Sequence, residues 1–277
     1  MRVMLSTAMS AALLLMLPAC QQQEAASDAP AAAAASLEAL NGTWKVDLAS
    51  LKFEQKPNEF LLKDGSYSCS TCLPPLTSPA DGQYHPVADR PYYDSMQIKT
   101  VDDRTVEFHR KKGDKEVSSN VLTVSEDGNK LTNKFHDATT PNSPPIDGEV
   151  SSTRAGPAPE GAHAISGQWM PDRFADYSEQ ALDITYQVSG KTVTQTSQGQ
   201  SWTAEIGGPA VAIQNDPGGT MVAVAAEGAS GLRETYTRDG KEIGVTTIVP
   251  SADGTSFNFT NFDPRDQSKV TWTANKK

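Results

Sequence analysis

The sequence has few of the residues that usually build catalytic and metal centres. Only three cysteines and four histidines occur in 277 residues. The motifs of a serine nucleophile, a zinc protease, a phosphate loop and a calcium loop are absent. The histidines lack the spacing of paired metal ligands; they are His85, His109, His136 and His163. We therefore expect no enzymatic activity, no metal and no cofactor.

The sequence also lacks a long apolar run and an excess of basic residues, and both absences restrict which partners we expect. After its N-terminus the sequence has no apolar run of about 18 residues, the length that a membrane-spanning helix needs. Basic residues are also outnumbered, with 24 Lys and Arg against 34 Asp and Glu and a net charge of −10. Because an acidic protein does not attract nucleic acid by charge, we expect no nucleic-acid partner.

The N-terminus has the pattern of an export signal. Arg2 precedes an apolar stretch that ends at Leu17, which predicts a signal peptide over residues 1–19. Residues 17–20, Leu-Pro-Ala-Cys, resemble the lipobox of bacterial lipoproteins, whose cysteine is diacylated and becomes the mature N-terminus. The resemblance implies a membrane partner through lipid on Cys20, since each buried CH₂ of an acyl chain contributes about 0.8 kcal/mol. A simply secreted protein is the alternative.

The residues after this cysteine bear on location. Enterobacterial lipoproteins with Asp in the next position stay in the inner membrane, whereas this sequence has Gln21. Similarity to that sorting rule favours the outer membrane, with the protein facing the periplasm. Residues 20–38 are rich in Ala and Gln and lack aromatic and β-branched side chains. Such a segment buries too little apolar surface to order its backbone, which predicts a disordered tether.

From Leu40 onward the pattern is that of an all-β protein. Short runs of alternating apolar and polar residues, such as 104–110 and 117–124, are typical of half-buried antiparallel strands. Asp-Gly pairs at residues 64, 127, 239 and 253 offer the positive φ angles of tight hairpins. One exception is 172–181, where polar residues predict a short helix over a barrel mouth.

The chain also resembles itself. Residues 40–47 (LNGTWKVD) align with 165–172 (ISGQWMPD), and the later hairpin loops follow in the same order. Each copy is long enough for roughly eight strands, and an antiparallel meander of that size removes its edges by closing. We predict two tandem up-and-down barrels, one over 39–155 and one over 165–277, each around its own core. The Pro-, Gly- and Ala-rich residues 156–164 are the predicted linker.

Each copy begins with Gly-x-Trp on its first strand, at Gly42 and Trp44 and again at Gly167 and Trp169. This motif resembles that of the lipocalins, in which the tryptophan packs across the closed barrel end. Together with the C-x-x-C motif, the repeated Gly-x-Trp is similar to a group of proteobacterial envelope lipoproteins. The resemblance implies the architecture and brings no function with it.

Cys69 and Cys72 form the one motif that suggests a mechanism. Cysteines in an oxidising compartment usually pair as a structural disulfide, which is our expectation. A redox-active pair would need a helix N-terminus at the first cysteine, but the motif runs into Leu73-Pro74-Pro75. A zinc site would need two further ligands. A thiol-disulfide or metal-handling protein of the periplasm stays the alternative function.

Aromatic residues gather in the loop-rich stretch after this motif, at Tyr84, Tyr92 and Tyr93, and Trp202 stands near the corresponding place in the second copy. They are the candidate ligand-binding residues, forming an aromatic cap over a barrel mouth. The alternative is a loop that packs against itself. The leading expectation is a membrane-anchored, non-enzymatic binding or scaffold module, with a small apolar ligand as its more specific form.

Overall fold

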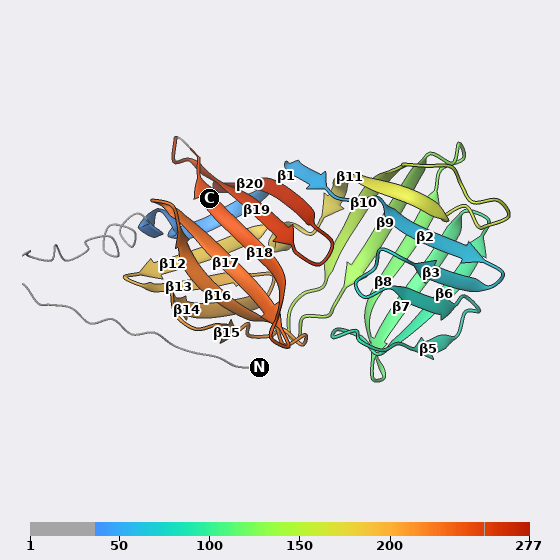
Figure 1. Cartoon of the computed structure of the whole chain (residues 1–277), viewed down its shortest axis with the longest axis horizontal. Coiled ribbons are helices and arrows are strands. Elements are labelled where there is room, and N and C mark those ends of the chain that lie inside the picture. The colour runs from blue at the N-terminus through green and yellow to red at the C-terminus, as the bar shows by residue number, and fades with distance from the viewer. Residues whose placement is uncertain (1–36, 252) are drawn as a thin grey trace, which may run out of the picture.

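The structure is a computed structural model that describes residues 37–251 and 253–277. The predicted signal peptide, Cys20 and nearly all of the predicted tether lie outside the described residues. The described chain is all-β, with two short 3-10 helices, η1 (Glu38–Leu40) and η2 (Glu179–Ala181). Its strands form two antiparallel sheets of ten strands, which curl into two nearly closed barrels lying side by side (Figure 1). The predicted fold class is confirmed, although each barrel has more strands than the eight expected.

We call the two sheets the N-barrel and the C-barrel. The strands of the N-barrel are β2 (Asn58–Lys63), β3 (Ser66–Cys69), β4 (Leu76–Pro79), β5 (Tyr84–Pro86), β6 (Ser95–Asp102), β7 (Thr105–Lys112), β8 (Lys115–Val124), β9 (Lys130–Asp137), β10 (Ile146–Arg154) and β11 (Gly167–Tyr177). The strands of the C-barrel are β1 (Gly42–Glu54), β12 (Asp183–Ser189), β13 (Thr192–Ser197), β14 (Gln200–Glu205), β15 (Val211–Ala212), β16 (Met221–Glu227), β17 (Gly231–Arg238), β18 (Lys241–Pro250), β19 (Ser256–Asp263) and β20 (Ser268–Lys276).

The two copies exchange their first strands. β1, the first strand of the first copy, lies between β12 and β20 in the C-barrel. β11, the first strand of the second copy, lies between β2 and β10 in the N-barrel. In Figure 1 the blue β1 therefore continues the red and orange barrel, while the yellow β11 completes the green one. The N-barrel is a continuous piece of chain, and the C-barrel is assembled from both sides of it.

This exchange corrects the predicted boundaries. The segment 156–164 does not separate the barrels, because it joins two neighbouring strands of the N-barrel, β10 and β11. The guanidinium of Arg154 holds it there by donating to the carbonyls of Ser166 and Ala164, each at 2.8 Å. The chain crosses between barrels at 55–57 and at 178–182 instead. Pro57 disfavours helical backbone at the residue before it, and the chain continues from β1 into β2 of the other barrel.

The copies nevertheless have equivalent strand registers. Trp44 pairs with Ile184 in one barrel, and Trp169 pairs with Asn58 in the other. Each indole N–H donates to the carbonyl four residues earlier, Trp44 to Leu40 at 2.7 Å and Trp169 to Ile165 at 2.8 Å. Both rings are fully buried. The expectation that the two tryptophans occupy equivalent positions therefore holds.

The glycine of each Gly-x-Trp motif has a conformational reason. Gly42 has a φ of 126° and Gly167 a φ of 115°, a region that side chains with a Cβ rarely enter. This bend at the start of the strand turns the following tryptophan into the core. The short helix predicted within 172–181 is confined to the three residues of η2, since β11 continues through Tyr177. Pairing with β10, in a register interrupted by two shifts, holds residues 173–177 in the strand.

Candidate ligand cavity

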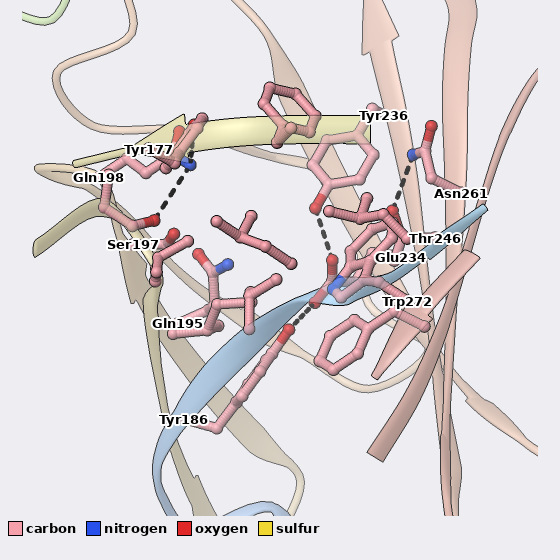
Figure 2. Close-up of a pocket in the computed structure, with 18 residues that line it drawn as sticks. Tyr177, Tyr186, Gln195, Ser197, Gln198, Glu234, Tyr236, Thr246, Asn261 and Trp272 are labelled. Atoms are coloured by element: carbon pink, nitrogen blue, oxygen red, sulfur yellow. Dashed lines mark hydrogen bonds between the residues drawn. The ribbon is translucent and has the colours of Figure 1, made fainter. Parts of the chain in front are cut away.

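The interior of the C-barrel is hollow on one side of its core. A cavity of about 350 Å³ lies between the barrel wall and the junction with the N-barrel (Figure 2). Its wall is mostly apolar and aromatic, with Val46, Leu48, Leu51, Phe174, Tyr177, Ala181, Leu182, Ile184, Tyr186, Tyr236, Phe259 and Trp272. The polar lining residues are Gln195, Ser197, Gln198, Glu234, Thr246 and Asn261. A mostly apolar space with a few convergent polar groups is the usual form of a small-molecule site.

Glu234 is the chemical centre of this cavity. It stands on β17 at an inward position and is only 1% exposed. Tyr186 of β12 donates its hydroxyl to Glu234 Oε1 at 2.8 Å, and Tyr236 donates to Oε2 at 2.5 Å (Figure 2). Each carboxyl oxygen therefore has one phenol partner.

Burial governs the electrostatics of this trio. Desolvation raises the pKa of Glu234 to about 7, and the hydrogen bonds from Tyr236 and Tyr186 counteract part of that rise. Desolvation also raises the pKa of both tyrosines well above the usual value, helped by the neighbouring carboxyl charge. The phenols thus stay protonated as donors, while Glu234 changes its charge near neutral pH.

Two further polar groups face the same space. Asn261 Nδ2 donates to Thr246 Oγ1 at 3.0 Å, which satisfies part of the amide. The indole nitrogen of Trp272 is buried and has no hydrogen-bond partner among the described residues. A buried donor without a partner costs free energy, on the order of 1–3 kcal/mol.

The N-barrel contributes the rim of the cavity. Phe174 and Tyr177 of the exchanged strand β11 line it, and Gln198 Nε2 of the C-barrel donates to the Tyr177 hydroxyl at 3.2 Å. Phe174 also contacts Phe53 and Phe135, with ring centroids 6.2 and 6.5 Å apart. Side chains from both barrels thus meet at the rim, and the strand exchange builds part of the site.

The N-barrel has different side chains at the equivalent inner positions. Glu234 pairs with Thr246, and by the same register Phe108 pairs with Asn120. Phe108 is buried and contacts the Tyr67 ring edge-on, with centroids 5.0 Å apart. Phe60 stands where the C-barrel has Tyr186, paired with Cys69 as Tyr186 is paired with Gln195. The acid and one of its phenols are thus replaced by phenylalanine.

The four residues predicted to bind a ligand are not brought together. Trp202 is buried in the core of the C-barrel. Tyr93 packs against the core of the N-barrel, with the Arg110 guanidinium 5.5 Å from its ring centroid. Tyr84 accepts Lys111 over its ring at 4.0 Å and donates to Glu116. None of these, nor Tyr92, is among the described residues that line the cavity.

Tyr92 instead connects the barrels. Its hydroxyl accepts a hydrogen bond from Arg238 of the C-barrel at 2.7 Å. Its ring lies against Gly218, where an added Cβ would come within 2.7 Å of the tyrosine. Tyr92 therefore packs onto the C-barrel. Neither the predicted aromatic cap nor the alternative of a self-packing loop included this contact.

Cys69 and Cys72 form a disulfide, as predicted. Cys69 is buried in the N-barrel core at 1% exposure, and the bridge closes a loop with a sequence separation of only 3. Over the described residues no group of three or more His, Cys, Asp or Glu could hold a metal ion. No helix in the described part of the chain is long and apolar enough to cross a membrane.

The sequence interpretation missed Glu234 altogether. A signal was present, since Glu234 alternates with Leu232 and Tyr236 in a run whose pattern places all three on one face of the strand. Alignment of the two copies would have given Glu234 and Phe108 the same position in the repeat. No protein-family model, curated protein or solved structure matches this chain.

Proposed function

We propose that this protein is a lipid-anchored, non-enzymatic binding protein that takes a small, mainly apolar molecule into the C-barrel cavity. The observation that carries the proposal is Glu234, an acid buried in a mostly apolar and aromatic interior. Burying a carboxyl group costs stability, and its neutral form is favoured to the extent that its pKa rises. The N-barrel keeps the same strand register with Phe108 in that place, so the fold does not require an acid there.

The size of the cavity supports the same proposal. Its volume of about 350 Å³ lies at the lower end of the 300–1,000 Å³ typical of small-molecule sites. A ligand of that size would contact the aromatic wall on one side, while the mouth of the cavity stays open to solvent. Under this proposal the N-barrel is a scaffold that supplies Phe174 and Tyr177 to the rim.

Native mass spectrometry of the full-length protein extracted from its own envelope tests this function. We expect a small molecule to copurify with the protein. Gln195→Phe should displace it, because the new ring would occupy the cavity. Gln187→Phe is the matched control, since Gln187 is exposed on the outer face of the neighbouring strand. Equal retention in the two variants, or no bound molecule in the parent protein, would contradict the proposal.

The anchor has a separate test. Cys20→Ser removes the thiol that the lipobox would acylate, so the variant should leave the detergent phase in a phase-separation assay. A variant that still partitions into detergent would show that Cys20 is not the anchor. Outer-membrane location, facing the periplasm, stays part of the proposal and is checked by fractionating the envelope.

The alternative function, a thiol-disulfide or metal-handling protein, has less support. An exchange reaction needs a sulfur that a partner thiolate can attack; Cys69 is buried at 1% exposure, which leaves only the half-buried Cys72 within reach. The bridge lies in the N-barrel, and Gln195 occupies the position of Cys69 in the other barrel. The disulfide is better explained as a local staple of the first copy.

A further inference from the structure

We propose that the C-barrel cavity selects an organic monocation, an amine or quaternary ammonium ion, whose charged end lies beside Glu234 and whose apolar body fills the aromatic space. This inference rests on the proposed function and specifies the chemical class of the ligand.

Glu234 has no counter-ion among the described residues that line the cavity. Of the 18 described residues that line the cavity, Glu234 alone carries a full charge when ionised. No Lys, Arg or His is among them, so the lining offers no counter-ion. A buried charge without a counter-ion is unfavourable. A cationic ligand would supply the missing positive charge.

The carboxylate of Glu234 has hydrogen-bond acceptor sites that the two phenols do not use. An ionised carboxylate has about four lone-pair sites. Tyr186 and Tyr236 each donate one hydrogen bond, one to either oxygen. The remaining sites are open to a bound ammonium group, and Figure 2 shows the carboxyl group between the two phenols at the side of the cavity.

Aromatic rings line the cavity together with the acid. Tyr186, Tyr236, Phe259 and Trp272 all line the same cavity as the acid. The rings of Phe259 and Trp272 stack with centroids 5.2 Å apart and an interplanar angle of 9°. Aromatic faces around a desolvated site attract quaternary ammonium ions through the ring quadrupole. A carboxylate among such rings matches a cation with an apolar body better than it matches an anion or a plain hydrocarbon.

The competing ligand is a neutral molecule hydrogen-bonded to protonated Glu234, and pH separates the two. Besides Glu234, the titratable groups that face the cavity are Tyr236 on the same strand, Tyr186 of β12 and Tyr177 of β11. The lining residues of β1, η2, β13, β18, β19 and β20 carry none. Burial raises the pKa of Tyr177, Tyr186 and Tyr236. Among the groups that face the cavity, Glu234 is therefore the one that changes charge between pH 6 and pH 8.

The experiment compares two probes of nearly identical shape, phenyltrimethylammonium and tert-butylbenzene, bound to the full-length protein in detergent. Broadening of their methyl NMR signals, titrated against protein, gives both affinities. At pH 8 the cation should bind about tenfold tighter or more. Because Glu234 ionises as pH rises through about 7, this preference should shrink several-fold at pH 6. Binding of tert-butylbenzene should stay nearly constant.

A pair of variants provides the matched test. Glu234→Gln keeps the shape of the side chain and should remove both the preference for the cation and its pH dependence. Glu205→Gln changes an exposed carboxylate of the same barrel and should change neither. If Glu234→Gln does not fold, the pH dependence of the parent protein still decides.

The outcomes separate the two proposals. Tight binding of tert-butylbenzene with no preference for the cation at pH 8 would overturn this inference and leave the proposed function standing. Failure of both probes to bind at either pH would overturn both. A preference for the cation that survives unchanged in Glu234→Gln would overturn the role of the carboxylate.

Discussion

The two barrels share one strand register and differ in what stands at the same inner position. The N-barrel has Phe108 there and the C-barrel has Glu234. The neighbouring position is Phe60 in one and Tyr186 in the other. The difference teaches that backbone pairing and core chemistry are separable in a duplicated barrel. One barrel has phenylalanine at both positions, while the other has a cavity lined by the acid and its phenol partner.

The exchanged strands tie these two solutions together. Each barrel is completed by a strand from the other copy, and β11 carries Phe174 and Tyr177 to the rim of the cavity. A change in the stability of the N-barrel would therefore reach the ligand site through its wall. Changes to the exchanged strands, the two tryptophans, the buried acid and the disulfide test this comparison, in decreasing order of expected effect.

The exchange itself is tested by cutting the chain in two ways. A fragment of residues 58–177 contains every strand of the N-barrel and should fold with a cooperative thermal transition. A fragment of residues 58–155 lacks both β11 and its repeat equivalent β1, so β2 and β10 would become unpaired edges. It should unfold non-cooperatively or aggregate. Circular dichroism and gel filtration compare the two; the opposite ranking would contradict the exchange.

The two tryptophans test the equivalence of the barrel ends. Trp44→Ala and Trp169→Ala each remove a fully buried ring and the hydrogen bond of its indole N–H. Each should lower the free energy of unfolding by about 3–5 kcal/mol. Urea denaturation followed by circular dichroism measures both. A loss below about 1 kcal/mol in one variant and not in the other would show that the ends are not equivalent.

Glu234→Gln tests the cost of the buried acid. Burial raises the pKa of Glu234 to about 7 in the folded protein, from an ordinary value of 4.5. Ionisation of the acid therefore costs no stability below pH 4.5, and its penalty grows as pH rises from there through 7. Relative to the parent, the variant should gain up to about 3 kcal/mol at pH 8 and little at pH 4.

Urea denaturation at the two pH values measures this gain, with Glu205→Gln as the control that should show no such pH dependence. An equal effect of Glu234→Gln at both values would mean that the carboxyl group has no raised pKa.

The disulfide should have the smallest effect. Replacing both Cys69 and Cys72 by Ser should lower the free energy of unfolding by about 2 kcal/mol at most, because the bridge closes a very short loop. Guanidinium denaturation measures the loss. The redox alternative makes a different prediction for the reduced protein, which iodoacetamide alkylation across pH detects. A thiol pKa below about 7, against an unperturbed value near 8.5, would contradict a structural bridge.

Local pattern was sufficient for several features of this protein. Period-two alternation and Asp-Gly turns predicted antiparallel strands, and an oxidising compartment inferred from the export signal predicted the bridge between Cys69 and Cys72. The prediction of an aromatic cap failed to anticipate Tyr92, because its partner Arg238 is distant in sequence and belongs to the other copy. Glu234 was overlooked because a single acid in a strand is ordinary until the partners facing it are known.

The sequence by itself determined the all-β class, the duplication and the equivalent places of Trp44 and Trp169, since each depends on residues close together in the chain or on their repetition. Only the tertiary structure decided which barrel each first strand completes. The two Gly-x-Trp strands are alike in pattern, and a sheet edge accepts either through the same backbone hydrogen bonds. Tertiary structure also decided that Glu234 is buried beneath two phenols, because desolvation depends on everything that packs around a group.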